Sequence, residues 1–268
     1  MDNRPIGVFD SGLGGLSCVK ELMRIMPNED VIYFGDTGRV PYGSRSQETL
    51  MKYVRQDIRF LKSFDIKMII IACGTASSAV LPWIEDELDT KILGVVDPAA
   101  KAAVKASVTK RIGVLGTEAT VRYGKYVDDI KSISPDTEVY QKACPLFVPL
   151  VENGYADSSV TKTIAKEYLR ELQDKGIDTL ILGCTHYPML KGVIKEIMGD
   201  GVTLIDSGAE AANCALELLK DMDLQGDENI GEYKYFVSDY AEDFARLGGM
   251  FLEKTICQNV EKIDIERY

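Results

Sequence analysis

The chain has 268 residues, of which 46% are hydrophobic and 27% charged, a composition typical of a globular protein with a full core. Its net charge of −11 argues against a surface that binds nucleic acid, and no apolar run is long enough to span a membrane. The first residues lack the basic and apolar regions of a signal peptide, so we expect a cytoplasmic protein with reduced thiols and no membrane partner.

Short apolar runs alternate with amphipathic segments along the chain, which predicts an α/β fold with largely parallel sheets. The expected strands are 6–9, 31–34, 68–72, 92–95, 111–115, 179–182 and 203–205. After the second of these, Ser44 and Gln47 have the spacing of a capping box and predict the start of a helix. The residues expected on its buried face are Leu50, Val54, Ile58 and Leu61.

Two loops that follow strands have the composition of ligand-binding loops. FDSGLGGLS (9–17) has Ser17 where a dinucleotide motif requires its third glycine, and no phosphate-loop lysine follows, so a nucleotide is not expected. Its backbone N–H groups could instead approach a carboxylate, or the loop could be a tight turn without a ligand. The polar stretch 35–46 is suited to closing over a small ligand.

Two stretches of the chain recur and predict two halves of common design. PIGVFDSG (5–12) resembles RIGVLGTE (111–118), and FDIKMIIIACGT (64–75) resembles KGIDTLILGCTH (175–186), so that Cys73 aligns with Cys184. We expect residues 1–97 and 208–268 to form one domain and residues 98–207 the other. The crossover is placed at Asp97-Pro98, because a residue before proline tends to leave regular structure.

Two of the six cysteines have the context of functional residues. Cys73 and Cys184 each follow a buried strand and precede a helix, where the helix N-terminus and the hydroxyls of Thr75 and Thr185 favour a thiolate. The others are interpreted as core residues: Cys18, Cys144, Cys214 and Cys257. With no CxxC pair, no HExxH motif and His186 as the single histidine, no metal site is expected.

Two thiols that face one cleft suit a reaction that needs a group on each face of a carbon, such as inversion of an α-carbon. A hydrolase using Cys184 and His186 would need one thiol and an acyl intermediate, and a two-lobed binder of small acids would need neither. His186 fits either an oriented acid or base or an ordinary histidine, and Glu152 either a partly buried or a solvated carboxylate. Asp10 is expected on the same rim.

Seven blocks occur in order along nearly the whole chain: GVFDSGLGGL, YFGDT, PYG, ACGTAS, GVLGT, FVPLVE and GCTHYP. With them the sequence resembles the cofactor-independent aspartate/glutamate racemase family. The resemblance implies two pseudo-symmetric flavodoxin-like domains with the substrate in the cleft between them, no pyridoxal phosphate, no metal and usually a homodimer. It also implies interconversion of L- and D-glutamate for peptidoglycan synthesis, with racemisation of another acidic amino acid, such as aspartate, as the alternative.

The resemblance also implies roles for individual residues. Cys73 and Cys184 would be the two acid/base groups, assisted by Asp10, Glu152 and His186. The substrate-binding positions would be Asp10, Ser11, Tyr42, Gly43, Gly74, Thr75, Thr117, Thr185 and His186. The family usually has asparagine where this chain has Gly74, so we expect Gly74→Asn to be tolerated and to tighten binding, unless the backbone there needs a positive φ.

Overall fold

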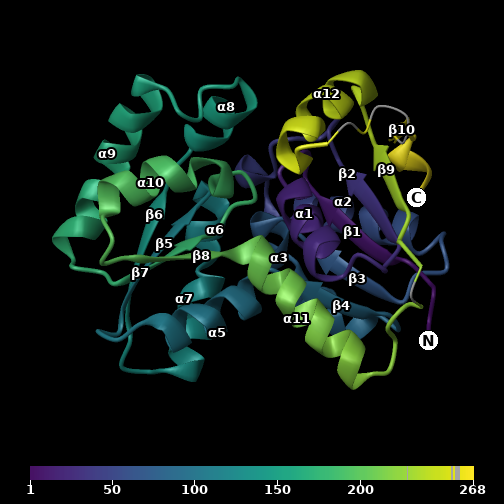
Figure 1. Cartoon of the computed structure of the whole chain (residues 1–268), viewed down its shortest axis with the longest axis horizontal. Coiled ribbons are helices and arrows are strands. Elements are labelled where there is room, and N and C mark those ends of the chain that lie inside the picture. Colours follow the sequence, from purple (N-terminus) through teal and green to yellow (C-terminus); the bar gives the residue numbers. More distant parts are fainter. Residues whose placement is uncertain (228, 255, 257–259) are drawn as a thin grey trace.

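The computed structural model describes residues 1–227, 229–254, 256 and 260–268. In these ranges the chain forms two lobes, each built on a parallel sheet with helices packed around it (Figure 1). This confirms the predicted α/β class with parallel sheets.

The first sheet has the strand order β10-β9-β2-β1-β3-β4, and all its pairs are parallel. Its strands are β1 (Ile6–Asp10), β2 (Val31–Gly35), β3 (Met68–Ile71), β4 (Lys91–Gly94), β9 (Tyr233–Val237) and β10 (Val260–Lys262). The second sheet has the order β6-β5-β7-β8, also parallel. Its strands are β5 (Arg111–Gly116), β6 (Glu138–Ala143), β7 (Thr179–Leu182) and β8 (Thr203–Asp206).

The two sheets share one topology, because β2-β1-β3-β4 and β6-β5-β7-β8 follow the same sequence of second, first, third and fourth strand. The recurring stretches of the sequence fall on equivalent strands, 5–12 and 111–118 on β1 and β5, and 64–75 and 175–186 on β3 and β7. This order is the flavodoxin-like one, in which ligands bind beyond the carboxyl ends of the strands. The predicted pseudo-symmetry of the fold is therefore present in the structure.

Burial explains which strands could be predicted. Every residue of β1, β3 and β7 is buried, so these strands are continuous apolar runs, as is typical of parallel sheets covered on both faces. No strand was predicted at β6, β9 or β10. β6 has the sequence EVYQKA and lies at the edge of its sheet with its residues partly exposed, so it lacks the apolar run.

The helices of the first lobe are α1 (Leu16–Ile25), α2 (Gln47–Leu61), α3 (Gly74–Ala79), α4 (Leu81–Ile84), α11 (Ser207–Asp221) and α12 (Ala241–Leu252). Those of the second are α5 (Val96–Ala106), α6 (Glu118–Tyr123), α7 (Lys125–Ile133), α8 (Phe147–Glu152), α9 (Ser159–Asp174) and α10 (Lys191–Met198). Short 3₁₀ turns are η1 (Tyr42–Ser44), η2 (Glu85–Glu87), η3 (Tyr187–Leu190) and η4 (Ile265–Arg267). Figure 1 shows α11 leaving the second lobe and running beside the first, where it packs against α1 as well as α5.

Two local predictions are wrong. The N-cap of α2 is Ser46, whose side chain accepts the N–H of Thr49, whereas Ser44 belongs to the 3₁₀ turn η1. The predicted buried face of α2 is nevertheless correct. Asp97 and Pro98 lie in the first turn of α5, where a proline is tolerated, so regular structure is not interrupted there. The exact domain boundaries stay a prediction.

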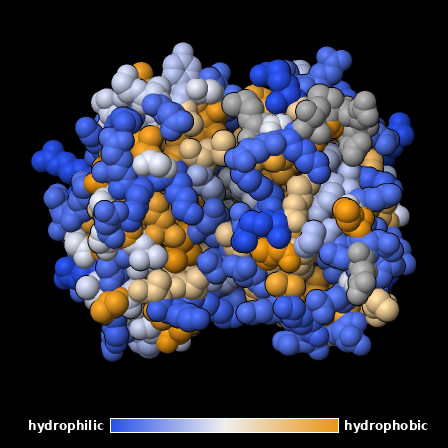
Figure 2. Space-filling model, in the orientation of Figure 1, coloured by the Kyte–Doolittle hydropathy of each residue, from blue (hydrophilic) through white to orange (hydrophobic). Residues whose placement is uncertain are grey.

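The surface is mostly polar. Figure 2 shows hydrophilic side chains over most of the face seen in Figure 1, with apolar side chains in scattered patches on both lobes. Within the described ranges, no helix combines the length and the apolar character needed to cross a membrane.

Candidate active site

A cavity of about 390 Å³ lies where the carboxyl ends of strands from both sheets meet. The first lobe contributes residues 11–12, 40–44 and 73–75, which follow β1, β2 and β3. The second lobe contributes residues 117–118 after β5, 144–145, 148–149 and 152 around α8, and 183–187 after β7. All the site residues predicted from the sequence line this cavity except Asp10, which lies directly behind the lining.

On the first lobe the cavity is bordered by Cys73, the N-cap residue of α3, which is 5% exposed. Its Sγ lies 3.6 Å from the Oγ of Ser11. Behind it, Asp10 is completely buried at the end of β1 and accepts the N–H of Gly12 at 3.0 Å. Burial and, next, the charge of Asp10 raise the pKa of Cys73 to about 12, against the smaller opposing effect of hydrogen bonds from Ala76 and Ser11. This half of the site therefore keeps its thiol protonated, and the expectation that the start of α3 favours a thiolate at Cys73 is wrong, because burial and the charge of Asp10 outweigh the helix N-terminus.

On the second lobe Cys184 follows β7 and is 7% exposed. Beside it His186 is buried, and its Nε2 lies 3.0 Å from Oε1 of Glu152, which comes from the end of α8. Burial acts to lower the pKa of His186, but the contacts with Cys184 and Glu152 outweigh it and raise this pKa to about 10. The imidazole therefore carries a positive charge at neutral pH, next to the sulfur.

The two halves are in direct contact across the cleft. Thr185 Oγ1 lies 3.5 Å from Oδ1 of Asp10, and the hydroxyls of Thr75 and Thr117 are 2.9 Å apart. Burial raises the pKa of Asp10, while the charge of His186 and backbone N–H groups oppose this. The two thiols thus belong to one connected polar site.

Glycines allow the lobes to approach so closely. A Cβ at Gly14 would lie 2.2 Å from Oγ1 of Thr185, and one at Gly43 would lie 3.1 Å from Cβ of Thr117. A Cβ at Gly74 would lie 2.4 Å from the carbonyl oxygen of Gly183. At Gly74 the contact is with backbone, so no side-chain rotation can relieve it and this position needs glycine in this conformation, whereas the contacts at Gly14 and Gly43 are with side chains.

The expectation that Gly74→Asn is simply tolerated is therefore wrong for this conformation. Gly74 opens α3 in helical geometry and does not have a positive φ, so backbone strain is not the reason. The obstacle is the Gly183 carbonyl of the opposite lobe. An asparagine can be placed only if the two loops move apart.

Sequence reasoning missed the apolar lining residues around α8, Pro145, Val148 and Pro149. Val40, Pro41 and Gly14 fall within the two predicted ligand-binding loops, 35–46 and 9–17, but were not singled out there. Such residues give no chemical signal before the fold is known. Cys144 was interpreted as core and is buried, but it also lines the cavity; it follows β6, a strand that the sequence does not reveal.

The remaining cysteines differ in burial. Cys18 is buried as predicted and Cys214 is partly exposed. Cys257 lies outside the described residues.

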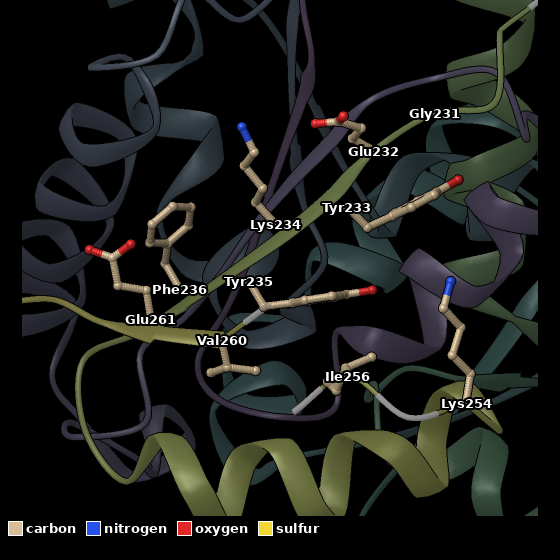
Figure 3. A pocket seen from close by; sticks show the side chains of 10 residues that line it. All are labelled: Gly231, Glu232, Tyr233, Lys234, Tyr235, Phe236, Lys254, Ile256, Val260 and Glu261. Atoms are coloured by element: carbon tan, nitrogen blue, oxygen red, sulfur yellow. The ribbon is translucent and has the colours of Figure 1, made fainter. Parts of the chain in front are cut away.

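A larger cavity, of about 820 Å³, lies along β9 and β10, away from these residues (Figure 3). Among the residues that the structure describes, its lining contains no cysteine, histidine or aspartate. In Figure 3, Glu232 and Lys234 point to the opposite side of β9 from Tyr233 and Tyr235, as alternation along a strand requires, so its charged groups do not converge. Among the described residues no group of three or more His, Cys, Asp or Glu side chains could hold a metal ion.

Comparison with known proteins agrees with this site. The family model described as Asp/Glu/Hydantoin racemase matches residues 12–215. The chain is 46% identical to the glutamate racemase of Geobacter metallireducens over 93% of both chains. Among solved structures it is similar to glutamate racemase from Bacillus anthracis, with a TM-score of 0.95 at 34% identity and 98% coverage of both chains. It is also similar to the Francisella tularensis glutamate racemase in complex with D-glutamate, with a TM-score of 0.93 at 39% identity and full coverage of both chains. By sequence and by structure, the chain belongs to the Asp/Glu/Hydantoin racemase family.

Proposed function

We propose that this protein is a glutamate racemase that interconverts L- and D-glutamate with two thiols as acid and base. The observation that supports it most is the pair Cys73 and Cys184, which border one cavity from opposite lobes at equivalent strand ends. A cavity of about 390 Å³ suits a small molecule. The names of the relatives, and the D-glutamate in the Francisella structure, support glutamate as the substrate.

In the direction from L- to D-glutamate, we assign the base to Cys184 and the acid to Cys73. The Cys184 thiolate, beside the cationic His186, removes the α-proton, and the Cys73 thiol delivers its proton to the other face of the carbanion. The step leaves Cys184 as the thiol and Cys73 as the thiolate, which is the form that takes up D-glutamate. Protons and charges balance within this step, and a proton must return from Cys184 to Cys73 through solvent before the next L-glutamate reacts.

The neighbouring residues support these two thiols. Glu152 holds the cationic form of His186, and Asp10 disfavours a second negative charge at Cys73 while it accepts N–H groups of the glycine loop. The hydroxyl and glycine residues of the lining are the candidates for holding the substrate: Ser11, Tyr42, Gly43, Gly74, Thr75, Thr117 and Thr185. Developing charge on the substrate would be met by these fixed dipoles.

We further propose, from the family resemblance, a cytoplasmic homodimer that supplies D-glutamate for peptidoglycan. The chemistry itself supports a reducing compartment, because both thiols must stay free, and Cys73 and Cys184 are free in the structure. Light scattering on the purified protein measures the oligomeric state.

One experiment separates the candidate functions. The protein is incubated in deuterated water with L-glutamate, L-aspartate or an amide, and inversion and α-deuteration are followed by chiral chromatography and mass spectrometry. We expect inverted, deuterated glutamate, with full activity after exhaustive chelation and without pyridoxal absorbance. Inversion of aspartate alone would favour a sister racemase, amide hydrolysis a hydrolase, and binding without exchange a binding protein.

A further inference from the structure

A buried ionic cluster lies beneath the wall that the first lobe contributes to the cavity. It consists of Asp36, Arg39, Tyr42 and Asp57, and we call it the Arg39 cluster. The two aspartates are completely buried, Tyr42 is 1% exposed and the Arg39 side chain is 10% exposed. Three of its members come from the loop after β2, and Asp57 comes from α2.

The guanidinium of Arg39 is the centre of this cluster. It donates from Nε to Oδ2 of Asp36 at 2.6 Å and from Nη2 to Oδ1 of Asp57 at 2.9 Å. Nη1 donates to Oε1 of Gln56 at 2.6 Å, and the group lies 4.2 Å above the ring of Tyr53. Buried arginine is held by this kind of planar, multiply bonded arrangement, which a lysine cannot reproduce.

The position of the Tyr42 hydroxyl indicates which of the two aspartates carries a proton. Its hydroxyl oxygen lies 2.5 Å from Oδ2 of Asp36 and 3.0 Å from Oδ2 of Asp57, yet it has a single proton to donate. Asp36 already accepts N–H from Arg39 and O–H from Ser238, as an ionised carboxylate does. The consistent arrangement is that Tyr42 donates to Asp36, and a protonated carboxyl of Asp57 donates to the Tyr42 oxygen.

Charge balance agrees with this assignment. With Asp57 neutral, Arg39 and Asp36 form one ion pair, and no uncompensated charge is buried. Burial and the neighbouring Asp36 raise the pKa of Asp57 well above its ordinary value. The two aspartates, though symmetric about Arg39, therefore have different chemical roles.

The Arg39 cluster is joined to the cavity by Tyr42 itself. Tyr42 begins the turn η1, and Tyr42, Gly43 and Ser44 all line the cavity. Gly43 packs against Thr117 of the other lobe, whose hydroxyl is bonded to Thr75. A shift of the turn would therefore change the shape of the cleft on the wall between the two thiols.

We propose that Arg39 is a positioning residue for the reaction: with Asp36 and Asp57 it holds Tyr42–Ser44 against the cleft, and so sets the affinity for both enantiomers. The proposal rests on the proposed function, since it names a determinant of affinity at the same site. Arg39 does not line the cavity, so its effect on the substrate is transmitted through the turn.

The test compares variants of the cluster by KM, kcat and melting temperature with L- and D-glutamate. Arg39→Met should raise KM in both directions by about tenfold or more, with a smaller change in kcat, because it disorders a binding wall and leaves the thiols in place. Asp36→Asn should be similarly harmful, because it removes the buried carboxylate 2.6 Å from Arg39 Nε and, with Asp57 neutral, leaves only the exposed Glu266 at 3.5 Å as a charged partner. Asp57→Asn should stay within about threefold of the parent, since an amide can donate to Tyr42 and accept from Arg39.

The matched control is Arg55→Met, which removes an arginine from the same helix as Asp57 but breaks an exposed pair with Glu87. It should leave KM unchanged. Arg39→Lys keeps the charge without the planar fork and should restore only part of the affinity.

Unchanged KM in a folded Arg39→Met variant would overturn the proposal, and so would equal losses for Asp57→Asn and Asp36→Asn. If Arg39→Met does not fold, Arg39→Lys and Asp36→Asn decide, because neither residue lines the cavity: each should raise KM by about threefold or more. If the parent protein does not racemise glutamate, the proposed function fails. Calorimetric titration of the parent and of Arg39→Met with D-glutamate then still tests whether Arg39 sets the affinity of the site.

Discussion

Cys73 follows β3 and Cys184 follows β7, at equivalent places in two sheets with the same strand order, but their surroundings differ. Cys73 has the buried Asp10 behind it, and its pKa is raised to about 12. Cys184 lies beside His186, whose own pKa is raised to about 10 and which is therefore a cation at neutral pH. The repeat thus places two identical groups symmetrically, but the side chains around them differ in charge: a buried aspartate lies behind Cys73 and a cationic histidine beside Cys184.

The different surroundings of the two thiols cannot make kcat/KM differ between the two directions of the reaction. The two enantiomers have equal free energies in water, so kcat/KM must be the same in both directions for the parent and for any variant. The electrostatic asymmetry must instead appear in the chemistry of each thiol, in the separate values of kcat and KM, and in the pH dependence of stability. The predictions that follow address these observables.

The largest effect is expected when either thiol is removed. Cys73→Ala and Cys184→Ala should each lower the rate of racemisation by about a thousandfold or more, because each removes one of the two proton-transfer groups. The control is Cys144→Ala, which removes a third buried thiol of the same cavity and should stay within about tenfold of the parent. If either variant still racemised glutamate at the parental rate, the cysteine that it lacks would have a structural role only.

Replacing the cationic His186 should change the reactivity of Cys184 more than that of Cys73. His186→Asn should lower kcat/KM by about a hundredfold, since it deprives the Cys184 thiolate of its charged neighbour. In the parent at neutral pH, iodoacetamide should modify Cys184 before Cys73, because the thiolate is the nucleophile. Peptide mass spectrometry after brief alkylation measures this preference, which should fall in His186→Asn. Faster modification of Cys73 in the parent would reverse the assignment of acid and base.

Stability should depend on pH through the same histidine. The pKa of His186 is raised from 6.5 to about 10 on folding, so its contribution is complete below pH 6.5 and is lost as pH rises toward 10. Within this window the free energy of unfolding should fall by up to about 1.4 kcal/mol per pH unit from this residue. Urea unfolding of the parent and of His186→Asn at several pH values measures the difference that this residue makes, including its coupling to Cys184. Parallel pH profiles would show that folding does not raise the pKa of His186.

The smallest effect is expected at the glycine contact between the halves. Gly74→Ala should weaken glutamate binding by about threefold to tenfold, because its Cβ would press on the Gly183 carbonyl and separate the loops. Gly192→Ala in α10 is the control: its Cβ meets no atom within 4 Å, so the substitution should be neutral or stabilise the helix by about 1 kcal/mol. Tighter binding by Gly74→Ala would show that the loops separate freely.

The sequence predicts those features that depend on a pattern within a few neighbouring residues. Cys73 and Cys184 were found because each stands at the end of a continuous apolar strand and the same pattern occurs twice. The capping box was misplaced because Ser44 and Ser46 both precede the helix, and only the backbone shows which side chain accepts an N–H of the first turn.

The rest of the site depends on contacts between residues far apart in the chain. Nothing near Gly74 in the sequence indicates that the Gly183 carbonyl faces it. Arg39 and Asp57 belong to a loop and a helix whose patterns are those of polar surface, and they become a buried cluster only after α2 packs beside β2. Edge strands such as β6 were missed because partial exposure removes the apolar run.

The most direct test of the two-thiol account is deuterium exchange into glutamate by the single-cysteine variants. Each remaining thiol should still exchange the α-proton on its own face, slowly, because the missing partner cannot complete inversion. We predict that Cys184→Ala incorporates deuterium into D-glutamate only, and Cys73→Ala into L-glutamate only, as measured by chiral chromatography with mass spectrometry over long incubations. Exchange of the same enantiomer by both variants would contradict the account, because it would place a single base on one face of the substrate.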